Sequence, residues 1–451
     1  MGSYAELRVG DFYLTSTKND IDPTLMTLFR ESDRVVSRGP PDLFPRERMT
    51  GDPLELEDAE PVDHVRYRCV VRHAIDRLDL AGFTREVASR GFARGLEARL
   101  RDLARWSRDY ADLVGAEVAV LRGLTLDDWI DGIREISARG LRPSFRDDEN
   151  CVSLPPLLNY MLCQHGHDAY GFPGYEYRHF LRLVLEGFDS EAEVAYDLTD
   201  LVLGGWVEST DELVAAAEST LSRDFISSQR VIVLTEGATD SRVLSAALRV
   251  VYPHLAEYFH FLDFEQSNLG GGAGALANTV KAFAGAGILN RTVALFDNDA
   301  AAHDAMRTLR GVSLPTGIRV ATYPDIDFLT DYPTIGPTGP ARMNVNGLAG
   351  SLELYMGSSA LADSDGEPIP VQWKGYVAAV ARYQGEITDK RLPLERFEDF
   401  MLRLSRGQAR ADEWDWRHLR EILDVLRRAF HDVDSKAIEA FELSEFYSGS
   451  A

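Results

Sequence analysis

The pattern of hydrophobic and polar positions changes its period near residue 226. Before this point, apolar residues recur at spacings of three and four, which predicts helices over residues 65–78 and 84–110 after two short N-terminal strands. After it, short apolar runs alternate with helical patterns and glycine-containing turns. We therefore expect a mixed, mostly helical N-terminal domain over residues 1–225, followed by an α/β domain.

The second region alternates strands with helices. Strands are predicted at 231–237, 258–265, 292–299 and 318–324, and helices at 240–250, 275–287 and 300–309. The segments VIVL and VALF are apolar throughout, as strands of a parallel sheet covered on both faces must be. The pattern predicts a doubly wound, mostly parallel sheet over residues 226–330, and residues 331–451 are predicted to be a helical C-terminal extension.

Composition limits the class of protein. The net charge of -24, from 72 acidic and 48 basic residues, argues against a protein that coats nucleic acid with its whole surface. It does not exclude a nuclease, because the carboxylates of a metal site count as negative charge. Three scattered cysteines indicate no disulfide framework, and no apolar run approaches the roughly 20 residues that span a bilayer. We expect a cytoplasmic protein without membrane contact, since the N-terminus also lacks the layout of a secretion signal.

Acidic residues follow two of the predicted strands. Glu236 follows VIVLT, whereas Asp297 and Asp299 end the segment TVALFDND. Functional groups of open α/β sheets collect at the carboxyl ends of the strands, so these carboxylates are expected to face one small volume. Carboxylates this close raise one another's pKa, and a divalent cation that prefers oxygen ligands neutralises them. The sequence therefore predicts a site for Mg²⁺ or Mn²⁺.

The order and spacing of these acids resemble the Toprim domain over residues 229–325. Toprim domains occur in topoisomerases, primases, repair proteins and the overcoming-lysogenisation-defect (OLD) nucleases. The segments YDLTDLVLGGW and NVNGLAGSLELYMG resemble bacterial proteins in which a HEPN/Toprim-associated N-terminal domain precedes a C-terminal Toprim nuclease. The chain lacks the G-x-x-x-x-G-K-[ST] motif, so ATP coupling within this polypeptide is not expected.

The resemblance implies that the segment after the Toprim core completes the site. Glu353 is the candidate metal ligand there, and Lys374 and Lys390 are candidates for stabilising negative charge at the scissile phosphate. In the two-metal arrangement of this family, one ion activates water and the other stabilises the leaving oxygen. Further acidic candidates are Asp240, Asp325, Asp327 and Glu386.

By this resemblance we expect a divalent-metal-dependent endonuclease that cleaves DNA, which is favoured over RNA, in bacterial defence against phage. Control by a regulatory protein partner or by a homo-oligomeric state is expected by analogy. Three alternatives stay open. The chain is a regulatory or scaffolding subunit that binds metal or nucleic acid without turnover, a strand-passage or primase-like enzyme, or an unrelated doubly wound domain with solvated loop acids.

Two histidine-containing motifs have competing explanations. Arg68 and His73 fit the R-x4-H spacing of HEPN ribonucleases, in which both side chains share one helical face, but this spacing arises easily by chance. Cys163, His165 and His167 are metal-ligand residue types without a second cluster to complete a zinc site. A half-buried polar turn is the alternative for these three residues.

Two further segments have both a phosphate-binding and a structural explanation. The arginine-rich segment 85–108 is interleaved with acids, which is typical of a solvated, salt-bridged helix as well as of a face that tracks phosphates. The glycine-rich run 269–276 opens a predicted helix. Its backbone N–H groups suit a phosphate, but a tight turn between strand and helix explains it equally well.

Overall fold

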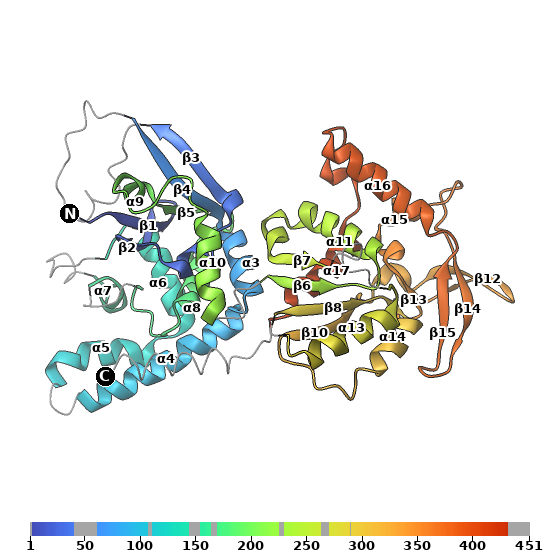
Figure 1. Cartoon of the computed structure of the whole chain (residues 1–451). Coiled ribbons are helices and arrows are strands. Elements are labelled where there is room, and N and C mark those ends of the chain that lie inside the picture. Colours follow the sequence, from blue (N-terminus) through green and yellow to red (C-terminus); the bar gives the residue numbers. More distant parts are fainter. Residues whose placement is uncertain are drawn as a thin grey trace. The chain divides into compact units, whose positions relative to one another are not determined.

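The chain divides into two compact units, which we call the N-terminal unit (residues 1–228) and the C-terminal unit (residues 229–430). Both are drawn in the computed structural model of Figure 1. The structure describes residues 2–39, 61–106, 111–143, 154–163, 169–224, 230–262, 270–288 and 290–431.

A five-stranded antiparallel sheet with the order β2-β1-β5-β4-β3 lies in the N-terminal unit. Its strands are β1 (Tyr4–Val9), β2 (Phe12–Lys18), β3 (Arg34–Gly39), β4 (Val62–Val70) and β5 (Glu193–Asp197). The two predicted N-terminal strands are confirmed. The prediction that a helix begins at residue 65 is wrong, because Val65, Tyr67 and Cys69 are buried in alternation with two arginines, which is the period of a half-buried strand.

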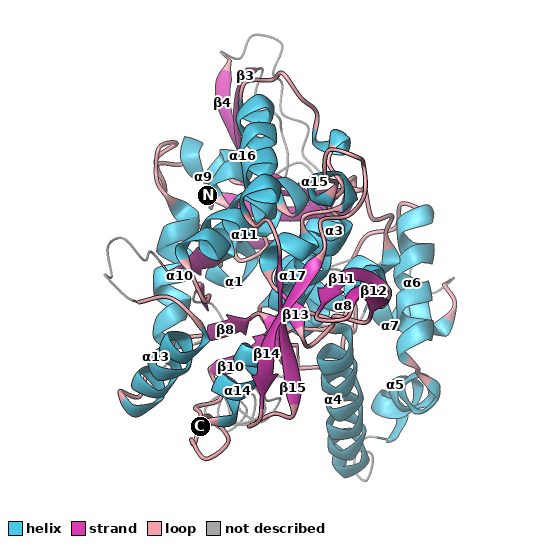
Figure 2. Cartoon of the chain, turned by 90° about the vertical axis from the view of Figure 1, so that its right-hand side faces the viewer, coloured by secondary structure: helices cyan, strands magenta, loops and turns pink. Residues whose placement is uncertain are grey.

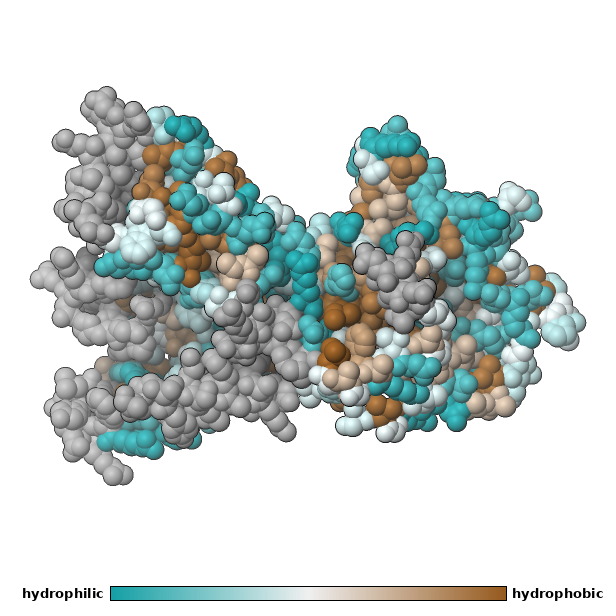
Figure 3. All heavy atoms as spheres, viewed as in Figure 1, coloured by the Kyte–Doolittle hydropathy of each residue, from teal (hydrophilic) through white to brown (hydrophobic). Residues whose placement is uncertain are grey.

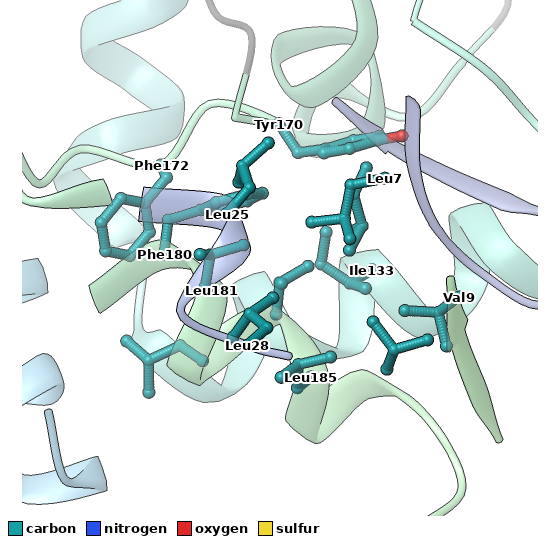
Figure 4. Packing of buried hydrophobic residues seen from close by; sticks show 14 of the residues in the cluster. Leu7, Val9, Leu25, Leu28, Ile133, Tyr170, Phe172, Phe180, Leu181 and Leu185 are labelled. Carbon is teal, nitrogen blue, oxygen red and sulfur yellow. The ribbon is translucent and has the colours of Figure 1, made fainter. Parts of the chain in front are cut away.

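The remaining elements of the N-terminal unit are mostly helical. They are α1 (Pro23–Met26), η1 (Glu31–Asp33), α3 (Val71–Leu80), α4 (Arg85–Trp106), α5 (Ala111–Gly123), α6 (Leu126–Ala138), α7 (Pro156–Cys163), α8 (Tyr177–Val184), η3 (Leu185–Gly187), α9 (Thr199–Leu203) and α10 (Leu213–Asp224). One hydrophobic cluster joins strands and helices, and Leu7, Ile133 and Phe180 are among its fully buried members (Figure 4). Burial of these side chains supplies the main favourable term in the folding of this unit.

The C-terminal unit contains a parallel sheet with the order β10-β8-β6-β7. Its strands are β6 (Val231–Leu234), β7 (Phe259–Phe261), β8 (Thr292–Phe296) and β10 (Ile318–Thr322). The surrounding helices are α11 (Ala238–Val251), η5 (Pro253–Tyr258), α13 (Ala273–Gly285), α14 (Ala300–Arg307) and α17 (Arg417–Arg428). Figure 1 shows α13 and α14 on one face of the sheet and α11 and α17 on the other. The predicted mixed α/β class with a parallel sheet is confirmed.

The two central strands of this sheet, β6 and β8, are apolar on both sides and so favour helices over both faces. Every residue of β8 is buried. Leu234, Ala294 and Phe296 share a hydrophobic cluster with residues of α13 and α14. All four strands run in the same direction, so their carboxyl ends meet at one edge of the sheet.

The expectation of a helical segment after residue 330 is wrong for residues 332–387. A second sheet forms there, with the order β12-β11-β14-β15. Its strands are β11 (Tyr332–Gly336), β12 (Gly339–Met343), β14 (Val371–Val377) and β15 (Arg382–Ile387). Figure 2 shows β14 and β15 as adjacent long strands. The prolines and glycines here are typical of loops, but Gly339, with a φ of +107°, forms the turn between β11 and β12.

The other elements of the C-terminal unit are short, apart from one helix. They are β9 (Asn298–Asp299), η6 (Asp327–Leu329), β13 (Ala349–Gly350), η7 (Leu352–Tyr355), α15 (Ser358–Leu361), α16 (Arg391–Ser405) and η8 (Ala411–Glu413). Strands β9 and β13 pair with each other, which joins the end of β8 to the segment that carries η7. Among the described residues after 330, α16 and α17 are thus the helices longer than four residues.

The surface of the C-terminal unit is largely polar on the face drawn in Figure 3, with hydrophobic residues in separate groups. In the part of the chain that the structure describes, every helix is too short or too polar to cross a lipid bilayer.

Candidate metal centre

Glu236 and Asp297 meet at the carboxyl edge of the parallel sheet. They follow β6 and β8, which are paired neighbours. The backbone N–H of Asp297 donates a hydrogen bond of 3.0 Å to Oε1 of Glu236. The structure therefore brings together two acids that lie 61 positions apart in the sequence.

Asp297 has one carboxylate oxygen without a hydrogen-bond partner. Its Oδ1 is buried and accepts no hydrogen bond from the protein. Burial raises the pKa of Asp297 well above its usual value, and the pKa is raised further by the charges of Asp240, Glu236, Asp299 and Glu353. A buried polar atom without a partner is rare and costs free energy, so this oxygen is suited to an external ligand.

Glu236 is held between β8 and the start of α13. Burial raises its pKa to about 7, and the charges of Asp299 and Asp240 act in the same direction, whereas hydrogen bonds from the backbone N–H groups of Asp297 and Ala273 lower it. These two N–H groups fix the carboxylate in place. Glu236 is thus a half-buried acid oriented by backbone donors.

The glycine-rich turn before α13 positions the backbone of Glu236. The N–H of Gly272 donates to the carbonyl oxygen of Glu236 over 2.7 Å. A Cβ atom at Gly271 would lie 3.2 Å from the same oxygen, and Gly272 has a φ of +99°. These contacts support the tight-turn interpretation of the run, whose first residue, Leu269, lies outside the described residues.

Asp240 and Glu353 extend this group of acids. Asp240 lies in the first turn of α11, and its pKa is raised to about 7 by burial and by the charge of Glu353, while Lys390 lowers it. Glu353 lies in η7 and is buried, with 8% of its surface exposed. Hence a segment beyond the parallel sheet contributes an acid at the edge where β6 and β8 end. We call Glu236, Asp240, Asp297 and Glu353 the acid cluster.

Asp299 has a different environment. Its Oδ1 accepts a hydrogen bond of 2.7 Å from the backbone N–H of Ala302 and so caps the N-terminus of α14. Its Oδ2 accepts a hydrogen bond of 2.7 Å from the side chain of Gln384. Both carboxylate oxygens already have partners, although the charge of Asp299 still raises the pKa of Glu236. Its role as a metal ligand stays a prediction that competes with helix capping.

The two candidate lysines share one acidic partner. Nζ of Lys390 lies 2.9 Å from Oε1 of Glu386, and Nζ of Lys374 lies 3.3 Å from its Oε2. Burial lowers the pKa of Lys390, but the hydrogen bond to Glu386 and the charges of Glu353, Glu386 and Asp297 outweigh it and raise the pKa. Lys390 therefore lies in the electric field of the acid cluster, whereas Lys374 contacts the outlying Glu386.

Sequence reasoning missed Tyr323, which directly follows β10 and is buried. Burial raises its pKa well above the usual value, and the pKa is raised further by the charges of Asp240, Asp297, Glu236 and Glu353. Its position after a fourth parallel strand was the available signal. Asp325, a predicted candidate two residues later, accepts a hydrogen bond of 2.7 Å from the side chain of Asn298.

The carboxylates of the acid cluster suit a hard divalent cation in ligand type and in charge. Carboxylate oxygens are the ligands that Mg²⁺ and Mn²⁺ prefer, and the partnerless Oδ1 of Asp297 lies among them. Among the described residues, no three His, Cys, Asp or Glu side chains are yet arranged around a single metal position. Metal binding would therefore require these carboxylates to turn closer together.

A known family model matches the N-terminal region of the chain. Residues 1–220 match the model of the HEPN/Toprim N-terminal domain 1. The match ends before β6, so it confirms the expected resemblance for the N-terminal region, while a Toprim domain over residues 229–325 stays a prediction. Neither a curated protein nor a solved structure matches the chain.

The R-x4-H spacing of Arg68 and His73 does not have the geometry of a HEPN ribonuclease site. Arg68 lies on strand β4 and His73 on helix α3, so the two side chains do not share one helical face, which supports a chance match. Arg68 instead pairs with Glu193 over 2.5 Å. Cys163 ends α7, and His165 and His167 lie outside the described residues.

The arginine-rich helix of the same domain match is salt-bridged. Four arginines of α4 have acidic partners, which are Glu186 for Arg85 (2.9 Å), Glu86 for Arg90 (2.7 Å), Glu117 for Arg99 (2.8 Å) and Asp102 for Arg105 (3.4 Å). Arg108 lies outside the described residues. These pairs support the interpretation of α4 as a salt-bridged helix.

Proposed function

We propose that the C-terminal unit is a divalent-metal-dependent nuclease that cleaves DNA phosphodiesters. The observation that carries the proposal is the acid cluster at the carboxyl edge of a parallel sheet, with a buried, partnerless Oδ1 of Asp297. Acids of this kind repel one another unless a cation joins them. The N-terminal match to a family named HEPN/Toprim adds support, because the order and spacing of the acids resemble Toprim.

In this proposal, different residues would bind the metal, accept a proton and stabilise negative charge. Bound Mg²⁺ or Mn²⁺ would polarise the scissile phosphate and activate water. Asp297, Glu236 and Glu353 would hold the ion, with Asp299 as a further ligand if it gave up its contacts with α14 and Gln384. Glu236 is the candidate to accept a proton from the attacking water. Lys390 would place positive charge near the phosphate, where negative charge develops during cleavage.

The biological setting follows from the resemblance alone. By that analogy, the nuclease acts inside bacterial cells against phage or foreign DNA. A regulatory protein partner or a homo-oligomeric state would restrain it, since an uncontrolled nuclease injures its host.

One observation favours a second function, in which the protein binds metal or nucleic acid without turnover as a regulatory subunit. In the region that the structure describes, the acids do not yet surround a single metal position. Both oxygens of Asp299 are also engaged within the protein. A site that binds without catalysing a reaction would not need the carboxylates to move closer together.

Plasmid cleavage separates the two functions. Full-length protein is incubated with supercoiled plasmid and Mg²⁺ or Mn²⁺, beside the Glu236→Ala and Asp297→Ala variants. The control is Asp399→Ala, which removes an exposed acid of α16 that pairs with Arg403. We expect nicking by the wild type and by Asp399→Ala, and none by the two cluster variants. Equal nicking by all four proteins, or none by the wild type, would contradict the nuclease.

A further inference from the structure

The β14–β15 hairpin exposes an aromatic pair. Tyr376 and Tyr383 lie opposite each other in the register of the two strands. Their side chains are 55% and 59% exposed, the highest values among the large hydrophobic side chains that the structure describes. The ring centroids are 5.1 Å apart with planes at 62°, and Trp373 lies 6.4 Å from Tyr383. Three aromatic rings thus form a ladder at the surface, and grouped exposed apolar side chains mark binding sites.

The hairpin and the residues after it differ in net charge from the chain as a whole. Residues 371–391 contain four basic side chains and two acidic ones, which are Lys374, Arg382, Lys390 and Arg391 against Glu386 and Asp389. The whole chain has 48 basic and 72 acidic residues. The hairpin and the residues after it are therefore a locally positive segment of an acidic protein, which suits a polyanionic partner.

The hairpin is also fixed to the elements that carry the metal centre. Gln384 follows Tyr383. Its side-chain N–H donates a hydrogen bond of 2.7 Å to Asp299, and its side-chain oxygen accepts one of 2.9 Å from the backbone N–H of Ala301. Arg382 donates a hydrogen bond of 3.1 Å to the carbonyl oxygen of Gly347. Because side chains alternate along a strand, Arg382 and Gln384 anchor one face of β15 while Tyr383 projects from the other. The aromatic ladder is thus held at a fixed place beside the acid cluster.

We propose that the β14–β15 hairpin binds a single-stranded segment of nucleic acid, whose bases stack on Tyr376 and Tyr383. The net positive charge of residues 371–391 would attract its phosphates. Single strands are favoured because the faces of the bases are covered in a duplex but open in an unpaired strand. The inference rests on the proposed function in one respect, since the hairpin would deliver this strand to the metal centre.

Binding is measured without cleavage. Full-length protein is titrated, in EDTA, into a fluorescent oligothymidine of about 20 nucleotides or a duplex of the same length, and anisotropy is recorded. The test variant is Tyr376→Ala/Tyr383→Ala. Tyr376→Phe/Tyr383→Phe keeps the rings, and Tyr175→Ala removes a tyrosine of the N-terminal unit that is 53% exposed. Thermal melting of each variant confirms that it is folded.

The wild type is expected to prefer the single strand. The double alanine variant is expected to bind it at least about tenfold more weakly, because stacking on one aromatic side chain contributes about a tenfold gain or more per base. The phenylalanine variant and Tyr175→Ala should stay within about twofold of the wild type. Equal binding by the alanine variant, equal affinity for duplex, or no binding by the wild type would each overturn the inference. The last result would indicate a protein partner for this surface.

Cleavage of plasmid in Mg²⁺ or Mn²⁺ by the same preparations keeps the two proposals distinguishable. Metal-dependent cleavage combined with tyrosine-independent binding overturns the hairpin proposal and leaves the nuclease. Tyrosine-dependent binding by a wild type that cleaves nothing overturns the nuclease and leaves the hairpin as a nucleic-acid binding surface.

Discussion

The two units bury charged side chains in opposite ways. In the N-terminal unit, buried charges lie in pairs of opposite sign, such as Arg77 with Asp33 (2.6 Å), Arg178 with Glu176 (2.7 Å) and Arg182 with Asp79 (2.6 Å). In the C-terminal unit, acids lie near other acids: the charges of Asp240 and Glu236 raise the pKa of Asp297, and the charge of Asp240 also raises the pKa of Glu236. Pairs of opposite sign are neutralised within the chain, whereas acids of like sign are neutralised by protonation, which their raised pKa values favour, or by a bound cation. The sign pattern of buried charges therefore distinguishes the acid cluster from the buried ion pairs better than burial does.

The same difference between the two units appears in the pKa shifts of Glu176 and Asp297, which are in opposite directions. Burial raises the pKa of Glu176, but the hydrogen bonds and charge of Arg178 outweigh burial and hold the pKa below its usual value. Burial also raises the pKa of Asp297, and the nearby acids raise it further. The pKa of a buried acid thus falls when an arginine is its neighbour and rises when its neighbours are other acids.

The largest expected effect comes from breaking a buried pair in the N-terminal unit. Arg178→Ala leaves Glu176 buried without its partner, so the free energy of unfolding should fall by about 3–5 kcal/mol. Arg90→Ala is the control, because its pair with Glu86 is exposed and should contribute less than about 1 kcal/mol. Chemical denaturation measures both. Equal losses would remove the distinction between buried and exposed pairs.

Next in size is the difference between the two lysines in cleavage. Lys390→Ala should lower kcat about a hundredfold, because this residue lies in the field of the acid cluster and would face the reacting phosphate. Lys374→Ala should have less than about a tenth of that effect, since both lysines contact Glu386 but it is Lys390 whose charge lowers the pKa of Asp240 in the acid cluster. Single-turnover cleavage of a labelled oligonucleotide measures both rates. The reverse order would assign the phosphate contact to Lys374.

A smaller effect of opposite sign is expected from Asp297→Asn. The change removes a buried negative charge from a group of like charges, so the metal-free protein at pH 8 should gain about 1–2 kcal/mol of stability. The rise in melting temperature on adding Mn²⁺ should disappear in this variant. Destabilisation comparable to that of Arg178→Ala would show that Asp297 has a structural partner after all.

The last effect is the pH dependence of the metal-free protein. The folded state raises the pKa of Glu236 from 4.5 and that of Asp240 from 3.8, both to about 7. Between these limits the folded state binds more protons than the unfolded state, so stability should fall as the pH rises from about 4 to 7, by at least about 1 kcal/mol. Stabilisation by Mg²⁺ should accordingly be larger at pH 8 than at pH 5. A Glu236→Gln/Asp240→Asn variant should have a flatter profile, and an unchanged profile would assign the effect to other groups.

The sequence predicted the parallel sheet well because its strands are apolar on both faces, a pattern that few other structures require. Glu236 and Asp297 were placed correctly at the ends of neighbouring strands for the same reason. The second sheet was missed because β11 and β12 are short and joined through glycines and prolines, which are typical of loops. Strand β4 was missed because it runs directly into helix α3, and the helical pattern of α3 was extended back to residue 65.

The rest of the candidate site depends on contacts that no local pattern reveals. Glu353 joins the acid cluster only because β13 pairs with β9 and brings η7 to the end of β8. Asp299 was expected to face the same small volume as Glu236 and Asp297, and its charge raises the pKa of both, but its oxygens cap α14 and bind Gln384, a residue 85 positions away. Tyr323 lies at the end of a strand that the sequence predicted, but its burial and the influence of the acid cluster on its pKa appear only in the structure.

The central claim is that the acid cluster binds a divalent cation through Asp297. A crystal structure of the protein grown with Mn²⁺, with anomalous scattering recorded at the manganese edge, tests it directly. We predict an anomalous peak about 2.2 Å from Oδ1 of Asp297, with Glu236 or Glu353 as a second ligand. A metal-saturated crystal with no peak within coordination distance of Asp297, or with manganese bound only elsewhere, would contradict the claim.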